Sequence, residues 1–148
     1  MVKDYRVKLL IDGFLKPKYD VFMPEKTYLQ LSDIGSYTVA FDLSNYVWDV
    51  VIKWDFFAKD ILGKQFARSV DSISANIAEG FGRYTKREKI QFYRYSFGSV
   101  KESQDWNEKA KYRNLLTQEQ YEHIFSVLNT LPRELNSLIK YTNEKLAI

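Results

Sequence analysis

Near the start of the chain, apolar and charged side chains alternate at the two-residue period of a β-strand. This alternation runs from Tyr5 to Asp12, and Asp12-Gly13 has the composition of a tight hairpin turn. A return strand from Phe14 to Phe22 is compatible with the pattern, and Pro17 would confine that strand to a sheet edge. A β-hairpin is therefore one conformation predicted here. An isolated hairpin is marginal in water, so we expect it to pack on the rest of the chain or pair with another copy.

From about Ser36 the apolar spacing changes to the period of an amphipathic helix. One stripe of this first helix contains Ala40, Leu43, Val47, Val50 or Val51, and Trp54. A second stripe contains Phe41, Trp48 and Ile52. A helix that is apolar on two sides must bury both of them. We therefore expect the second stripe to face either the same bundle or a neighbouring subunit.

Three further helices follow at short intervals. The second is predicted from about Asp60 to Phe81 by apolar residues spaced three or four apart. A Thr followed three residues later by Glu or Gln forms a capping box, and this pattern predicts helix starts at Thr85 and Thr117. The third helix should continue to about Tyr112, and the fourth should run almost to the end of the sequence.

Long amphipathic helices joined by short connections pack as antiparallel neighbours. The sequence therefore predicts an all-α protein, an antiparallel up-and-down four-helix bundle over residues 35–148 preceded by an N-terminal extension over residues 1–34. The third helix carries small residues at Ser96, Gly98 and Ser99. We expect these to allow close approach of a neighbouring helix.

Composition bounds the size and the setting of this protein. The 148 residues suffice for one core, but they include 11 Tyr, 10 Phe and 3 Trp, so some rings are expected at a subunit interface. The absence of cysteine excludes disulfides and thiolate metal sites, and it favours the cytoplasm. The N-terminus lacks an apolar signal core and the longest uncharged run is the ten residues 123–132, so we expect no membrane association.

The inventory of reactive side chains argues against an enzyme. His123 is the only histidine, which leaves metal triads, di-iron sites and Ser–His or Cys–His nucleophiles unsupported. We therefore expect no catalytic residue, metal site or cofactor. Gly80-Phe81-Gly82 resembles a phosphate loop only weakly, because no strand precedes it and no Lys-Ser or Lys-Thr pair follows. Both glycines are predicted to act as breakers that end the second helix.

Two glutamates, Glu79 and Glu102, could meet across the second and third helices. Paired carboxylates can act as acid and base, but this reading requires a pocket. A structural polar network that fixes helix register is the favoured interpretation, since buried polar groups need partners. Its predicted members are Arg68, Asn76, Glu79, Ser99 and Glu102.

The net charge of +3 is unevenly distributed, because residues 63–113 carry eleven basic and six acidic side chains. The predicted nucleic-acid-binding residues are Arg83, Lys86, Arg87, Lys89 and Arg94, with assistance from Lys64 and Lys101. They lie near a helix N-terminus, which favours anions, and aromatic rings are interleaved with them. Phosphate contacts with stacking rings suit RNA or single strands. The alternative is a solvated helix face that only aids solubility.

The segment Ser72–Arg83, SISANIAEGFGR, resembles the signature of a bacterial family of four-helix bundles. The family is named from reading frames in the intervening sequences of 23S ribosomal RNA genes. Four features downstream match the family pattern: Phe92, Gly98-Ser99, Glu102 and Ala110. Two positions depart from it, since Ser103 and Asn107 are polar where the family usually has leucine. Residues 1–34 have no counterpart.

This resemblance implies an antiparallel four-helix bundle, commonly a ring-like homopentamer, without an assigned catalytic activity. The family is also similar to the accessory proteins of diversity-generating retroelements, which are basic pentamers that bind RNA and a reverse transcriptase. The net charge of this chain is small by comparison. A fold transfers between relatives more safely than a function does.

Two hypotheses of function follow. The first is a non-enzymatic oligomeric protein that binds structured RNA or another nucleic acid through the basic stretch from Arg83 to Arg94. The second is a protein-binding scaffold or accessory subunit, in which the aromatic first helix and the N-terminal extension dock a protein partner. Salt-sensitive binding is expected of the first hypothesis. Salt-insensitive binding that is lost when Trp48 or Phe41 is replaced is expected of the second.

Overall fold

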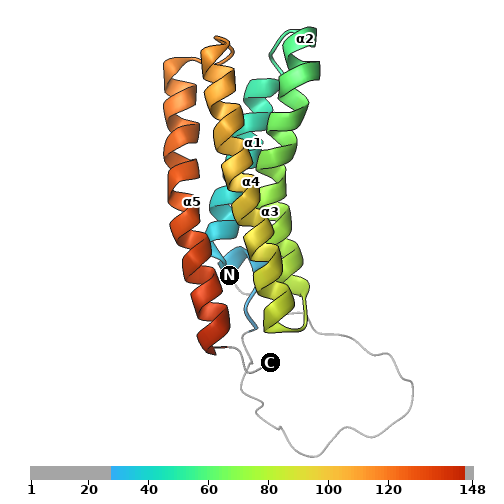
Figure 1. Ribbon diagram of the computed structural model, residues 1–148, viewed down its shortest axis with the longest axis vertical. Helices are drawn as coiled ribbons and strands as arrows, with labels where there is room; N and C mark the ends of the chain where they lie inside the picture. Colours follow the sequence, from blue (N-terminus) through green and yellow to red (C-terminus); the bar gives the residue numbers. More distant parts are fainter. Residues whose placement is uncertain (1–27, 146–148) are drawn as a thin grey trace, which may run out of the picture.

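The structure is a computed structural model that describes residues 28–145. Figure 1 shows long helices side by side, with the chain passing alternately in opposite directions along the bundle. The predicted all-α, antiparallel up-and-down four-helix bundle is confirmed. The predicted hairpin before residue 28 lies outside the described residues, as do residues 146–148.

The bundle is made of four helical rods. A 3-10 turn, η1 (Leu31–Asp33), precedes the first rod, α1 (Gly35–Val51). The second rod is continuous and consists of α2 (Phe56–Ala58), the π-helical turn η2 (Lys59–Gly63) and α3 (Lys64–Gly82). The third and fourth rods are α4 (Lys86–Tyr112) and α5 (Gln118–Lys145).

The second rod begins at Phe56, earlier than the start predicted at Asp60. Asp55 caps it, because its side-chain Oδ1 accepts a hydrogen bond from the backbone N of Ala58 at 3.0 Å. The prediction missed this start because an Asp cap ahead of only one turn carries little periodic signal.

The two predicted capping boxes are confirmed. At the start of α4 the backbone N of Glu88 donates to Thr85 Oγ1 at 3.2 Å, and the Glu88 carboxylate accepts from Thr85 N at 3.2 Å. At the start of α5 the corresponding bonds between Thr117 and Gln120 are 3.1 and 3.0 Å long. Two orphan backbone donors are thus satisfied at each helix start. The third predicted helix ends at Tyr112, as expected.

The apolar stripes of the four rods converge on one core. Its largest fully buried side chains are Phe66, Leu43, Leu62, Ile73, Ile77, Ile124, Leu128, Leu131, Leu135, Val47, Val70 and Val100. The first stripe predicted for the first helix is buried in this core from Ala40 to Val51. Trp54, the last residue of that stripe, is half-buried and lies beyond the end of α1 at Val51, so the helix is shorter than predicted. The helix periodicity read from the sequence therefore identified the inward faces correctly.

The contact between α3 and α4 is built partly from buried hydroxyl groups. Ser96 Oγ donates to the backbone O of Ile73 at 2.8 Å. Ser103 Oγ lies 3.0 Å from Ser69 Oγ, and both residues are buried. Small side chains and short cross-helix bonds keep these two helices close together. The predicted role of Ser96 in close helix approach is confirmed.

Two glycines behave differently from their predicted roles. Helix α3 runs through Gly80 and ends at Gly82, so Gly80 is not a breaker. A Cβ at Gly80 would lie 2.6 Å from the Tyr93 ring and 3.0 Å from the backbone O of Lys89, which explains why this position has no side chain. Gly98 is exposed, and a Cβ there would meet nothing within 4 Å. The prediction that Gly98 allows a neighbouring helix of the same chain to approach is wrong.

Candidate nucleic-acid interface

An open groove lies between the first turns of α4 and the end of α5. Its volume is about 450 Å³, and its lining residues are Lys86, Arg87, Ile90, Gln91, Arg94 and Asn143. Three of the five predicted nucleic-acid-binding cations therefore gather at one place. None of these six lining residues is acidic. The groove thus presents positive charge and amide donors to solvent, which are the groups that bind phosphate oxygens.

The start of α4 positions these cations. Lys86 is the first residue of the helix and donates from Nζ to the backbone O of Asn143 at 3.2 Å, which ties α4 to α5. Arg87 and Arg94 are seven residues apart, so they project from nearly the same side of the helix. Both are exposed.

The helix N-terminus itself is occupied by its own cap. Glu88 accepts hydrogen bonds from the hydroxyl and the backbone N of Thr85, and these bonds hold the pKa of Glu88 below its ordinary value. A carboxylate therefore already takes the place that a phosphate would take at the free backbone amides. Anion binding in the groove must come from the side chains.

Arg83 is engaged within the chain. Its guanidinium forms an ion pair with Glu79 and lies over the Phe92 ring, with Cζ 4.5 Å from the ring centroid. These contacts hold Arg83 against α3 and α4, outside the lining of the groove. A paired and stacked guanidinium offers fewer free donors to a phosphate than the groove cations do.

Lys89 is also engaged, on a different side of α4. Its Nζ donates to the backbone O of Phe81 at 2.7 Å, and partial burial lowers the pKa of Lys89. It lines a separate apolar cavity of about 340 Å³ with Phe81 and Tyr93. Three of the five predicted cations therefore line the groove, whereas Arg83 and Lys89 bond to α3 and lie outside its lining.

The two assisting lysines, Lys101 and Lys64, lie in different parts of the bundle. Lys101 lies on the exposed side of α4, seven residues after Arg94, so it continues the row of cations along the helix. Lys64 begins α3 and forms an ion pair with Asp60. A helix rises ~1.5 Å per residue, so Lys64 lies at the end of the bundle opposite to the groove. The structure does not bring Lys64 to the candidate site.

The predicted polar network is not assembled. Among residues 28–145, no hydrogen bond joins two of its five members. Asn76, Ser99 and Glu102 each bond within their own helix, to Ser72 O, Tyr95 O and Trp106 Nε1 respectively. Glu79 pairs with Arg83, and Arg68 is exposed. Helical periodicity alone does not distinguish these positions from the truly buried hydroxyls of Ser69, Ser96 and Ser103.

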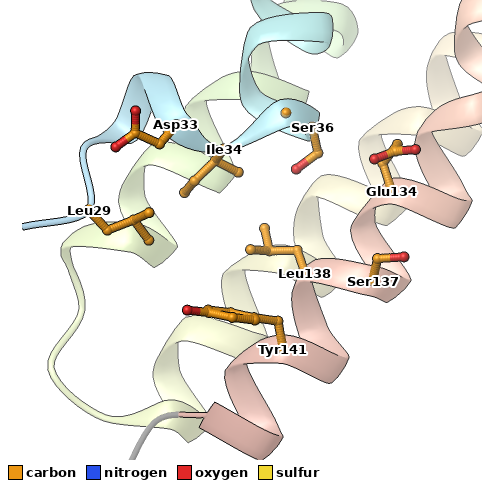
Figure 2. Close-up of a pocket in the computed structure, with 9 residues that line it drawn as sticks. Leu29, Asp33, Ile34, Ser36, Glu134, Ser137, Leu138 and Tyr141 are labelled. Atoms are coloured by element: carbon orange, nitrogen blue, oxygen red, sulfur yellow. The ribbon is translucent and has the colours of Figure 1, made fainter.

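A second apolar cavity, of about 380 Å³, lies at the same end of the bundle (Figure 2). Leu29 and Ile34 face Leu138 and Tyr141 of α5 across it. These four residues also line the cavity beside Lys89, so the two cavities are neighbours. This cavity could not be predicted from local sequence patterns, because it forms where the segment before α1 meets the end of α5.

The predicted second stripe of α1 faces away from the core. Phe41 is 49% exposed, Trp48 57% and Ile52 42%. Large apolar side chains aligned on one helix face are uncommon on the surface of a monomer. The second stripe was predicted to face either the core of its own bundle or a neighbouring subunit. In the described residues it does not face the core.

The described part of the chain contains no group of three or more His, Asp or Glu side chains placed to hold a metal ion. His123 lies at the surface, with its ring centroid 4.3 Å from that of Tyr46. Among the helices of residues 28–145, none combines the length and the apolar character needed to cross a bilayer.

The fold and the site define an all-α four-helix bundle with a cationic groove at one end and an aromatic outer helix face. Residues 32–137 match the family of 23S rRNA-intervening sequence proteins, and the chain belongs to that family. The resemblance seen in the segment Ser72–Arg83 is thereby confirmed.

A solved structure has the same fold. It is the crystal structure of a protein of unknown function from the S23 ribosomal protein family of Bacteroides thetaiotaomicron VPI-5482. The two chains are 23% identical, with a TM-score of 0.64 over 71% of this chain and 98% of the other. At this identity the likeness shows the fold alone. No curated protein matches the chain.

Proposed function

We propose that this protein is a cytoplasmic, non-enzymatic, oligomeric module that binds structured RNA or another nucleic acid through its cationic groove. The observation that carries the proposal is the gathering of Lys86, Arg87 and Arg94 in one groove whose lining includes no carboxylate. Phosphate groups are the polyanionic ligand that such a groove fits best. Family membership supports the fold, and the proposed binding rests on the groove.

One copy of the groove offers only three cations, which would give weak binding at physiological salt. An oligomer multiplies this affinity, because several grooves displayed together contact one nucleic acid at a high effective concentration. The exposed aromatic stripe of α1 supports such an assembly, since covering Phe41 and Trp48 removes apolar surface from water. The proposed oligomer is a ring-like homopentamer, as family resemblance suggests.

The test is binding of a labelled, structured RNA hairpin across a salt series. The altered protein carries Lys86→Glu, Arg87→Glu and Arg94→Glu. A matched control carries Lys53→Glu, Arg68→Glu and Arg133→Glu, three exposed positions outside the groove. Each reversal changes the charge by two, so three reversals lower the net charge of both variants by six, from +3 to −3.

We expect wild-type affinity to fall steeply with salt, with a log–log slope that loses about two to three units in the groove variant. The control should retain most of its affinity. Equal loss in both variants would mean that total charge, and not the groove, governs binding. Wild-type protein that fails to bind at low salt would refute the proposal.

The second candidate function is a scaffold that docks a protein. The exposed stripe of Phe41, Trp48 and Ile52 favours it, because aromatic side chains dominate the energetics of protein interfaces. Binding of this kind would be nearly independent of salt and would survive reversal of the groove cations.

A further inference from the structure

The glycines of the described chain separate into those that the fold explains and one that it does not. Gly63 and Gly80 have no room for a Cβ, which would lie 2.7 Å from Val51 and 2.6 Å from Tyr93 respectively. Gly35 and Gly82 are the first and last residues of helices, where glycine is well tolerated. The remaining glycine, Gly98, has neither explanation.

Gly98 lies in the middle of α4, twelve residues after its start at Lys86 and fourteen before its end at Tyr112. Glycine is the least favourable residue for a helix interior apart from proline. An alanine would fit, since nothing lies within 4 Å of a Cβ at this position. The bundle itself therefore gains nothing from this glycine.

Cationic side chains precede and follow Gly98 along the exposed side of α4. Arg94 lies one turn before it and Lys101 one turn after it on the exposed side of α4, and Arg87 lies a further seven residues back. The nearest carboxylate along the helix is that of Glu102, four residues after Gly98. It accepts a hydrogen bond from Trp106 Nε1 at 3.3 Å. The row of cations thus leads from the groove across the glycine.

We propose that the sugar–phosphate backbone of the bound nucleic acid crosses α4 at Gly98, between Arg94 and Lys101. This inference rests on the proposed function and extends the binding site from the groove to the middle of the helix. The missing side chain lets a phosphate come close to the helix backbone, a known use of glycine at binding surfaces. Close approach strengthens the attraction to both flanking cations, because Coulomb energy rises as distance falls.

A second copy of this chain is the other body that could approach a bare helix surface. The charges disfavour it, because Arg87, Arg94 and Lys101 would bring like charges into a dry contact. The exposed aromatic stripe of α1 is a better surface for that purpose. The nucleic-acid backbone is therefore the favoured occupant, and a copy–copy contact becomes an outcome of the test.

The experiment compares Gly98→Ala and Gly98→Leu with the full-length wild-type protein. Gly35→Ala is the matched control, since it also adds a methyl group in open space, at the start of α1. The measurements are the dissociation constant for the labelled RNA hairpin, the thermal midpoint, and the mass in solution. Gly98→Ala should raise the midpoint by about 3 °C, because alanine favours the helix.

We expect the dissociation constant to rise about threefold for Gly98→Ala and at least about tenfold for Gly98→Leu, as the phosphate is pushed away from its cations. Gly35→Ala should leave it unchanged. If both Gly98 variants bind as tightly as wild type, the crossing at Gly98 is wrong while the groove proposal stands. A changed mass in solution would instead assign Gly98 to a contact between copies. Absence of wild-type binding would overturn both proposals.

Discussion

Helices α1 and α4 occupy diagonal positions in the bundle, and each packs between α3 and α5. They differ most in the side chains that they expose. α1 buries an apolar stripe and exposes a second one that includes Phe41 and Trp48. α4 buries Ser96 and Ser103 among its inward residues, and it exposes a row of cations. Two helices with equivalent neighbours in the bundle can therefore differ both in the residues that they bury and in the residues that they expose.

This difference indicates which kind of partner suits each face. An apolar outward face gains free energy when another protein covers it. A cationic outward face loses solvation in a dry protein contact, but it is compensated when the partner is a polyanion that brings opposite charge. We therefore propose that copies of the chain associate through α1 and that nucleic acid contacts α4. Three changes test this comparison of α1 and α4, in addition to the experiments on the groove and on Gly98: the first tests the outward faces, the second the inward contact of α4, and the third the start of α4.

The largest effect is expected from placing charge on the outward face of α1. In the double variant Phe41→Asp and Trp48→Asp, assembly would bury unpaired carboxylates, which costs several kcal/mol for each copy. We expect the mass measured by light scattering after size exclusion to fall to that of one 17.5 kDa chain. The helical circular dichroism of the chain should persist, because both side chains are about half exposed in the single chain.

The matched control for this variant is Arg87→Asp with Arg94→Asp, which places the same carboxylates on the outward face of α4. It should leave the mass unchanged and weaken RNA binding. If the α4 variant dissociates and the α1 variant does not, the assignment of the two faces is reversed.

A smaller effect is expected inside the α3–α4 contact. Ser103→Ala removes the hydrogen bond to Ser69 Oγ and should lower the free energy of unfolding by about 1 kcal/mol. Ser103→Leu, which restores the residue type usual in the family, should cost about 2 kcal/mol because the close helices leave no room. Urea denaturation measures both values.

Ser137→Leu makes the same substitution at an exposed position of α5 and should be nearly neutral. If Ser103→Leu is as stable as wild type, α3 and α4 are less closely packed at this level than the hydroxyl contacts indicate. The buried hydroxyl groups on the inward face of α4 would then have no energetic meaning.

The smallest effect concerns the start of α4. Hydrogen bonds from Thr85 lower the pKa of Glu88 in the folded state, so the folded state favours the carboxylate more than the unfolded state does. This contribution to stability is present above the ordinary glutamate pKa of about 4.3, and it is lost as the pH falls through the lower folded pKa. Glu88→Gln should therefore be less stable than wild type at pH 7, and the difference should shrink below about pH 4. Thermal midpoints across this range measure it, and a difference that does not change with pH would contradict it.

Much of the fold followed from local patterns in the sequence. The capping boxes at Thr85 and Thr117 predicted two helix starts, because a cap depends on side chains only three residues apart. The inward stripes were also predictable, since a period of 3.6 residues selects one side of a helix. The early start at Phe56 escaped prediction because a single turn has no period to recognise.

The candidate site was predicted only as a set of residues. The sequence identified five cations near one helix start, but it could not separate Arg83 and Lys89, which bond to α3, from the three that line the groove. The polar network failed for a similar reason, because its five residues share a periodicity with positions that point outward or bond within their own helix. Which polar group is buried depends on neighbours that are distant in sequence.

The sequence by itself determined the four long helices, the apolar side of each helix that faces the core, the family, and the concentration of positive charge in residues 63–113. These properties depend on side-chain chemistry and on spacing within one or two helical turns. Only the tertiary structure decided that Asn143 of α5 completes the groove of α4, that Gly80 is required by Tyr93, and that Gly98 has open space around it. Each of these depends on distances between helices, which the packing of the whole bundle sets.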